Sequence, residues 1–261
     1  LINNPNIQLS LKNTVLNYQT VLGIGVAAEA SLANRKLLIK NLRLMTKSSG
    51  VAIFGNIDLA PKSPLMALSL LTENLELSVL NLPRGLSGRA SLEIDVEGTL
   101  ESPTVDVRGS LREFCVDLHE TSKRLCIDAV QTESNLSKDL FSLKSFRVRD
   151  SEWGMISATG NGSVRKRSFS GAIDVVDFPL PMLDRVLAKP IGLAGTLDAD
   201  LSISGTLDHP IGGGKIEIQG LRRGRYELGD VTVLALANEL KSTIQVLLLD
   251  GQRLILNVPF D

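Results

Sequence analysis

The sequence predicts an all-β fold: a long, curled, mostly antiparallel sheet that forms a trough with a hydrophobic groove and carries one or two short helices. Three observations predict it. Leu92, Ile94 and Val96 alternate with acidic residues, and this period of two is typical of a strand with one apolar and one wet face. A long stretch of the chain is repeated. The apolar content is aliphatic, because hydrophobic residues make up 43% of the chain and aromatic residues only 4%.

The repeated stretch runs from residue 86 to residue 111 and returns at residue 193. The pairs that match at an offset of 107 (195 − 88) are Gly88 with Gly195, Gly98 with Gly205 and Pro103 with Pro210. A four-residue insertion at 211–214 would then change the offset to 111, at which Val105, Val107 and Gly109 match Ile216, Ile218 and Gly220. Self-similarity of this kind indicates stacked structural modules.

The N-terminal part of the chain supports the same pattern. Residues 1–17 read as a weak strand, residues 21–32 as a strand with close backbone approach at its glycines, and residues 37–59 as two strands around a turn. This last pair also recurs. Its matches are Leu42 with Phe146 and Leu44 with Val148 at an offset of 104, and Gly55 with Gly160 at 105.

Together the repeats predict one continuous elongated domain. It would consist of leading strands at 1–36, a first module at 37–140, a second at 141–225 and the start of a further module at 226–261. Because no crossover helices separate the strands, the sheet should be antiparallel.

Two short helices are expected between the repeated stretches, where they would cover the apolar face. One begins after Ser63 and Pro64, a capping residue followed by proline at the first helical position, and runs through residues 65–71. The other spans residues 180–188.

A hairpin centred on Glu120 and Thr121 would place Cys115 directly opposite Cys126, and Asp117 opposite Arg124. The two cysteines could form a cross-strand disulfide, which would indicate an oxidising compartment, or remain free thiols. The dipeptide at 250–251, Asp-Gly, predicts a second tight hairpin.

The sequence offers no catalytic residues, cofactor motif or metal site, so we expect a protein that is not an enzyme. His119 and His209 fall in turns, and Asp198 and Asp200 lie on the wet face of a strand. The glycines at 211–215 are read as a wide turn, because no helix follows as a phosphate loop requires. The net charge of −1 argues against binding to nucleic acid. The basic residues at 164–167 are read as a charged hairpin tip, with contact to lipid headgroups as the alternative.

The apolar face is expected to stay open as a groove. Sheets rarely exceed about 10 strands without curling or splitting, and aliphatic walls without fixed polar partners suit acyl chains. The residues predicted to line the groove are Val51, Ile53, Leu92, Ile94, Val96, Val105, Val107, Val116, Leu201, Ile203, Ile216 and Ile218. No apolar run approaches the ~18 residues that cross a bilayer. Because the chain begins at Leu1, without Met or a signal-like segment, we expect it to be a piece of a longer protein that could carry an anchor elsewhere.

Two motifs resemble the AsmA-like superfamily and, within it, the TamB family of translocation and assembly modules. They are Gly-Thr-Leu-x-x-Pro at 98–103 and 205–210, and the alternating pattern of residues 41–59. The resemblance implies a β-taco in the periplasm, anchored in the inner membrane, that carries phospholipids toward the outer membrane. It also implies an Omp85-type barrel as partner, through parts outside this chain, and support for barrel assembly. Chloroplast envelope relatives share the motif, which leaves a plastid envelope as a second location.

Two other functions fit the same pattern. A chaperone-like scaffold would offer strand edges to unfolded barrel proteins by β-augmentation. A structural β-repeat, such as a stalk or adhesin, would pack its apolar faces on each other.

Overall fold

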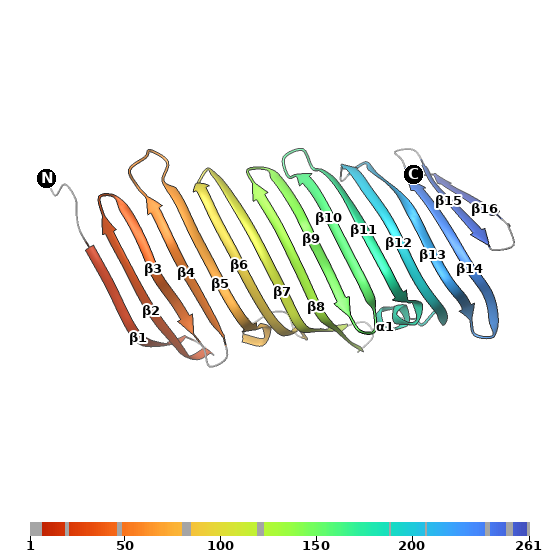
Figure 1. The fold of residues 1–261 in the computed structure, drawn as a ribbon, viewed down its shortest axis with the longest axis horizontal. Coiled ribbons are helices and arrows are strands. Elements are labelled where there is room, and N and C mark those ends of the chain that lie inside the picture. Colours follow the sequence, from red (N-terminus) through yellow and green to blue (C-terminus); the bar gives the residue numbers. More distant parts are fainter. Residues whose placement is uncertain are drawn as a thin grey trace. The chain divides into compact units, whose positions relative to one another are not determined.

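The computed structural model describes residues 7–18, 21–45, 49–79, 85–118, 123–187, 189–206, 208–237, 241–248 and 253–259. In this part of the chain the fold is all-β, with one antiparallel sheet that is not closed into a barrel, and this confirms the predicted fold class. The order of the strands in the sheet is their order in the chain (Figure 1).

Contacts divide the chain into two compact units, residues 1–114 with 132–138 and residues 115–131 with 139–261. The first unit contains β1 (Ile7–Tyr18), β2 (Val21–Ala33), β3 (Lys36–Met45), β4 (Gly50–Asp58), β5 (Leu65–Glu76), the 3₁₀ turn η1 (Leu77–Val79) and β6 (Ser87–Thr99). It also contains most of β7 (Ser102–Leu118) and the end of β8 (Lys123–Ser137). The predicted module boundaries rest on repeats rather than compactness and stay a prediction.

The second unit contains the rest of β7 and β8 and all later elements. These are β9 (Leu140–Asp150), β10 (Gly154–Ser163), β11 (Ser168–Pro179), η2 (Leu180–Met182), α1 (Leu183–Val186), β12 (Leu193–Thr206), β13 (Pro210–Arg223), β14 (Tyr226–Ala237), β15 (Lys241–Leu248) and β16 (Arg253–Pro259). β15 and β16 pair antiparallel, as the predicted hairpin requires, and its Asp-Gly turn lies outside the described residues.

The first predicted helix is wrong. Residues 65–76 form strand β5, which pairs along nearly its whole length with β4 and β6. Pairing on both sides outweighs the weak helical preference of a leucine-rich segment. The helical turn of this region, η1, comes only after β5 has ended, and its Leu77 is buried. The second predicted helix is present as η2 and α1.

The structure supports the repeat but corrects its alignment. Gly98 and Gly205 both have positive φ, at 100° and 110°, and at both a side chain would meet the backbone four residues later. At the other end of each hairpin, Glu113 and Gly220 share a left-handed backbone with φ of 51° and 61°. The offset is 107 there too (220 − 113), so the chain has no insertion at 211–214.

Residues 211–215 therefore lie within strand β13. The wide turn predicted for them is wrong. Gly212 pairs with Ile203 of β12, and Gly214 pairs with Leu201. A Cβ atom at Gly214 would lie 2.2 Å from the carbonyl oxygen of Asp200, so the absence of side chains lets the strands approach closely. At the constant offset, Gly212 and Gly214 correspond to Val105 and Val107.

The predicted disulfide is present. Cys115 and Cys126 are bonded, with their Cα atoms 4.1 Å apart on neighbouring strands. The carboxylate of Asp117 lies 4.0 Å from the guanidinium of Arg124, which agrees with the predicted register of this hairpin. Its predicted centre, Glu120 and Thr121, lies outside the described residues.

Candidate functional site: the aliphatic face of the sheet

In the first unit, residues that lie directly opposite each other on neighbouring strands build unbroken aliphatic rows. Partners in an antiparallel pair point to the same face of the sheet. The rows cross β2 to β6 in order, and three of them are Ala28–Leu42–Ile53–Leu70–Ile94, Ala30–Ile39–Gly55–Leu68–Val96 and Leu32–Leu37–Ile57–Met66–Gly98. From β2 to β6, these rows consist of Leu, Ile, Val, Met and Ala, with glycine at residues 55 and 98.

The second unit carries the same kind of rows across β9 to β14. Two of them are Val148–Ile156–Val175–Ala199–Ile216–Val233 and Phe146–Ala158–Ile173–Leu201–Gly214–Ala235. We call the surface formed by the rows of each unit its aliphatic face. In this unit the face holds more glycine and alanine than in the first.

The structure places the predicted lining residues as follows. Val51, Ile53, Leu92, Ile94 and Val96 share the aliphatic face of the first unit, and Leu201, Ile203, Ile216 and Ile218 share that of the second. Val105, Val107 and Val116 lie in β7. Eleven of the twelve are half-buried, and Ile203 is 41% exposed.

Sequence reasoning missed Met66, Leu68 and Leu70, which lie in the rows between Ile53 and Ile94, because it assigned them to a helix. A period of two is hidden in β5, since residues 66–71 are half-buried on both faces of the strand.

The aliphatic faces have no second layer within the part of the chain that the structure describes. The strands pair in chain order, and each packs mainly against its sequence neighbours. No side chain of the described residues is completely buried. The chain exposes 17620 Å² of surface, whereas a compact monomer of its mass, 28.2 kDa, exposes about 11,000 Å². The described residues therefore leave the aliphatic faces largely uncovered.

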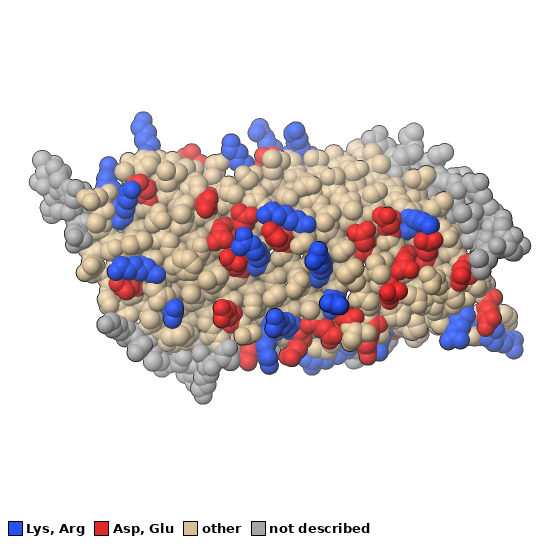
Figure 2. All heavy atoms as spheres, viewed as in Figure 1, with Lys and Arg blue, Asp and Glu red and all other residues tan. Residues whose placement is uncertain are grey.

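The opposite face is more polar and carries charges of both signs. In the first unit, Arg108 lies 3.1 Å from Glu93 and 3.9 Å from Asp95, and the Ser69 hydroxyl donates to Asp95 at 2.6 Å. The hydrogen bond to Glu93, followed by the charge of that carboxylate, raises the pKa of Arg108 above its ordinary value. Figure 2 shows Lys and Arg interspersed with Asp and Glu on the face in view. This mixed surface suits contact with water rather than with a polyanion.

A hydrophobic cluster covers one end of the aliphatic face in the second unit. Trp153 and Phe178 meet edge to face, with ring centroids 6.2 Å apart, and Met182 of η2 completes the buried cluster. Ile156, Val175 and Leu197, which belong to the aliphatic face, pack against it. The segment of η2 and α1 lies at the ends of β11 and β12 (Figure 1).

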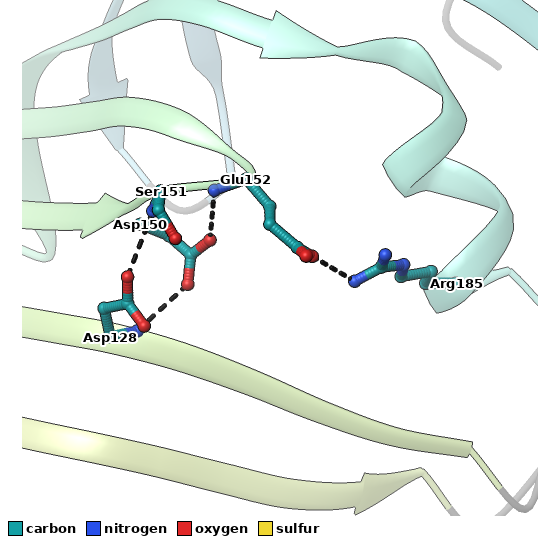
Figure 3. Close-up of polar contacts among 5 residues, drawn as sticks. All are labelled: Asp128, Asp150, Ser151, Glu152 and Arg185. Atoms are coloured by element: carbon teal, nitrogen blue, oxygen red, sulfur yellow. Dashed lines mark hydrogen bonds and ion pairs between the residues drawn. The ribbon is translucent and has the colours of Figure 1, made fainter.

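Polar contacts hold this covering segment in place (Figure 3). The carboxylate of Asp150 accepts the backbone N–H groups of Asp128 at 3.0 Å and Glu152 at 2.8 Å, and Asp128 accepts that of Ser151 at 3.1 Å. The guanidinium of Arg185 in α1 then donates to Glu152 at 2.6 Å. The loop around Trp153 and the helical segment are thereby tied together.

Among the described residues, no group of three His, Cys, Asp or Glu side chains lies close enough together to hold a metal ion. His209 lies in the β12–β13 turn and donates its backbone N–H to the Thr206 hydroxyl, whereas His119 lies outside the described residues. Asp198 accepts the backbone N–H of Asp177 at 2.8 Å, which is a structural use of that carboxylate.

None of the helices among the described residues has the length and apolar character to span a membrane. Comparison with models of protein families, with curated proteins and with solved structures finds no match.

Proposed function

We propose that this chain is a segment of a bridge-like lipid-transfer protein that conducts phospholipid acyl chains along the aliphatic face of each unit. The observation that carries the proposal is the uncovered aliphatic face of a single-layered sheet. A soluble monomer tolerates only a few hundred Å² of contiguous apolar surface, so a face built from whole rows of Leu, Ile and Val requires an apolar occupant.

Acyl chains fit this surface better than a folded protein partner does. Each CH₂ group removed from water contributes about 0.8 kcal/mol. An aliphatic wall without polar groups binds any stretch of hydrocarbon equally well, so a chain can slide along it. Protein interfaces instead tend to be enriched in Tyr, Trp and Arg anchors, and aromatic residues are scarce here at 4%.

The resemblance to the AsmA-like superfamily supports the cellular part of the proposal. The parent protein would be anchored in the inner membrane and would carry phospholipids through the periplasm toward an Omp85-type outer-membrane barrel, with support for barrel assembly. The disulfide between Cys115 and Cys126 agrees with an oxidising compartment such as the periplasm. The protein would act without a cofactor and would not be an enzyme.

The proposal is tested by placing a charge on either face of one strand. Val96→Arg puts a cation on the aliphatic face, where a poorly solvated charge costs several kcal/mol, so we expect bound phospholipid to fall about tenfold or more. Glu97→Arg is the matched control, because Glu97 is the exposed next residue on the opposite face. Phospholipid that co-purifies with each variant is counted by native mass spectrometry. Equal lipid content in the two variants would contradict the proposal.

A further inference from the structure

The ends of β9, β10 and β11 hold a cavity beside the β10–β11 turn. Phe141, Gly162 and Phe169 lie side by side there, since Gly162 pairs with Phe141 on one side and with Phe169 on the other. Because glycine has no side chain, a cavity of about 340 Å³ opens at this point, lined by Phe141, Gly162, Ser163, Val164, Arg167, Ser168 and Phe169. The backbones that carry the two phenylalanines are two strand spacings apart, about 9.6 Å.

Small residues extend from the cavity along the aliphatic face of the second unit. The next pair inward from Gly162 and Phe169 is Gly160 with Gly171, and the pair after that is Ala158 with Ile173. Only the pair Gly160 and Gly171 leaves the backbone bare. The strip leads from the cavity toward Ile156, which packs against the Trp153 cluster. The six residue steps from Gly162 to Ile156 span about 20 Å of strand.

The first unit shows what the same positions look like without the hollow. The pair Gly55 and Leu68 corresponds to Gly160 and Gly171, and the pair Ile57 and Met66 corresponds to Gly162 and Phe169. Two branched aliphatic side chains, at residues 57 and 68, are therefore replaced by glycine in the second unit. The same antiparallel strands accommodate side chains at these positions in the first unit. The cavity is therefore specific to the second unit and is not shared by the two copies of the repeat.

The turn beside the cavity is basic. The β10–β11 turn contains Arg165, Lys166 and Arg167, all exposed. Arg167 lines the cavity and lies 3.5 Å from Asp208. Arg165 and Lys166 have no acidic partner within the described ranges. The corresponding connection of the first unit, residues 59–64, carries Lys62 as its one basic residue.

We propose that this cavity seats an anionic glycerophospholipid. Arg165 and Lys166 would bind its phosphate, and the first part of one acyl chain would lie between Phe141 and Phe169 over Gly162 and Gly160. The cationic turn and the apolar cavity together match a molecule that is anionic at one end and aliphatic at the other. The inference rests on the proposed function, because it specifies where on the aliphatic face a lipid is held by its headgroup.

The test uses the purified chain with a reporter at the cavity. Phe169→Trp in a Trp153→Phe background places the single tryptophan beside Gly162. Vesicles of phosphatidylglycerol or of phosphatidylcholine, each with brominated acyl chains, supply lipids that quench this tryptophan on contact. We expect quenching at lower concentrations of phosphatidylglycerol than of phosphatidylcholine, and inorganic phosphate at the same concentration should not compete.

In this reporter, Arg165→Ser with Lys166→Ser should weaken the apparent affinity for phosphatidylglycerol about tenfold or more and leave that for phosphatidylcholine unchanged. The matched control is Arg222→Ser with Arg223→Ser. It removes the same charge from exposed residues of the same unit, at the turn between β13 and β14 on the opposite ends of the strands, and should have no effect.

A further variant, Gly162→Ile, gives the cavity the side chain that residue 57 carries in the first unit and should reduce quenching by both lipids. A Cβ atom there would lie 2.9 Å from the carbonyl oxygen of Ser168, so this variant also shifts the backbone. The test is therefore decided by the charge variants, which do not introduce such a contact.

Equal losses in the two double variants, no loss in either, or equal quenching by the two lipids would overturn the inference. Lipid that co-purifies with the chain without quenching residue 169 would overturn the inference alone. A chain that binds neither lipid would overturn the proposed function itself.

Discussion

At the scale of the residue, glycine determines where strands can bend and approach. Gly88 and Gly195 occupy equivalent places in the two repeated hairpins, with φ of 135° and 129°. A Cβ atom would lie 2.9 Å from the Cα of Phe114 in the first case and 2.7 Å from the carbonyl oxygen of Gln219 in the second. Both the backbone conformation and the space therefore require glycine at these two positions.

We predict that Gly88→Ala and Gly195→Ala each lower the free energy of unfolding by about 1–3 kcal/mol, the usual cost of a strained backbone conformation. Thermal or urea unfolding of each variant measures the loss. Gly25→Ala is the control, because its Cβ atom would meet its nearest neighbour at an ordinary 3.7 Å. A loss in the control as large as in the two variants would contradict this account.

Trp153 anchors the hydrophobic cluster at the end of the second unit's aliphatic face, where it is 8% exposed. We predict that Trp153→Ala lowers the free energy of unfolding by about 3–5 kcal/mol, since it leaves a large cavity against Phe178 and Met182. Trp153→Phe, which keeps an aromatic ring, should cost much less. Circular dichroism during heating compares the two variants, and similar losses would show that the cluster contributes little.

At the scale of the element, strands are held by their neighbours and by few other contacts. The disulfide between Cys115 and Cys126 joins β7 and β8 in the second unit, close to the end of their hairpin. Their sequence separation of 11 corresponds to about 3 kcal/mol of loop entropy removed from the unfolded chain.

Reduction of this bond should therefore lower the melting temperature of the wild-type protein. Cys115→Ser with Cys126→Ser should melt at the reduced value and show no response to reductant. If reductant leaves the wild type unchanged while thiol labelling shows both cysteines to be free, the bond does not stabilise the fold.

Elements also differ in how well the sequence predicts them. β6 is predictable because its acidic residues alternate with Leu92, Ile94 and Val96, so one face is wet along its length. β5 is not, because Met66 and Leu71 are half-buried on opposite faces and the alternation disappears. The signal that remained, a capping serine and proline before a leucine-rich run, is shared by helices and strands alike.

At the scale of the whole molecule, the repeat made the fold class predictable, whereas the local differences between its copies did not follow from the pattern. Gly212 and Gly214 stand where Val105 and Val107 stand in the first copy. This change hid the constant offset and suggested an insertion. The cavity at Gly162 escaped prediction for the same reason, since the sequence does not reveal which glycines of a strand face an apolar surface.

Lipid transfer by this chain requires that phospholipid be held on the aliphatic face. A photo-crosslinking amino acid introduced at residue 94 or at residue 95 tests this most directly, because Ile94 lies beside Leu70 on the aliphatic face and Asp95 lies beside Ser69 on the opposite one. After irradiation of the protein with bound phospholipid, we predict lipid adducts at residue 94 and none at residue 95. Adducts at residue 95 alone, or equal yields at the two positions, would contradict it.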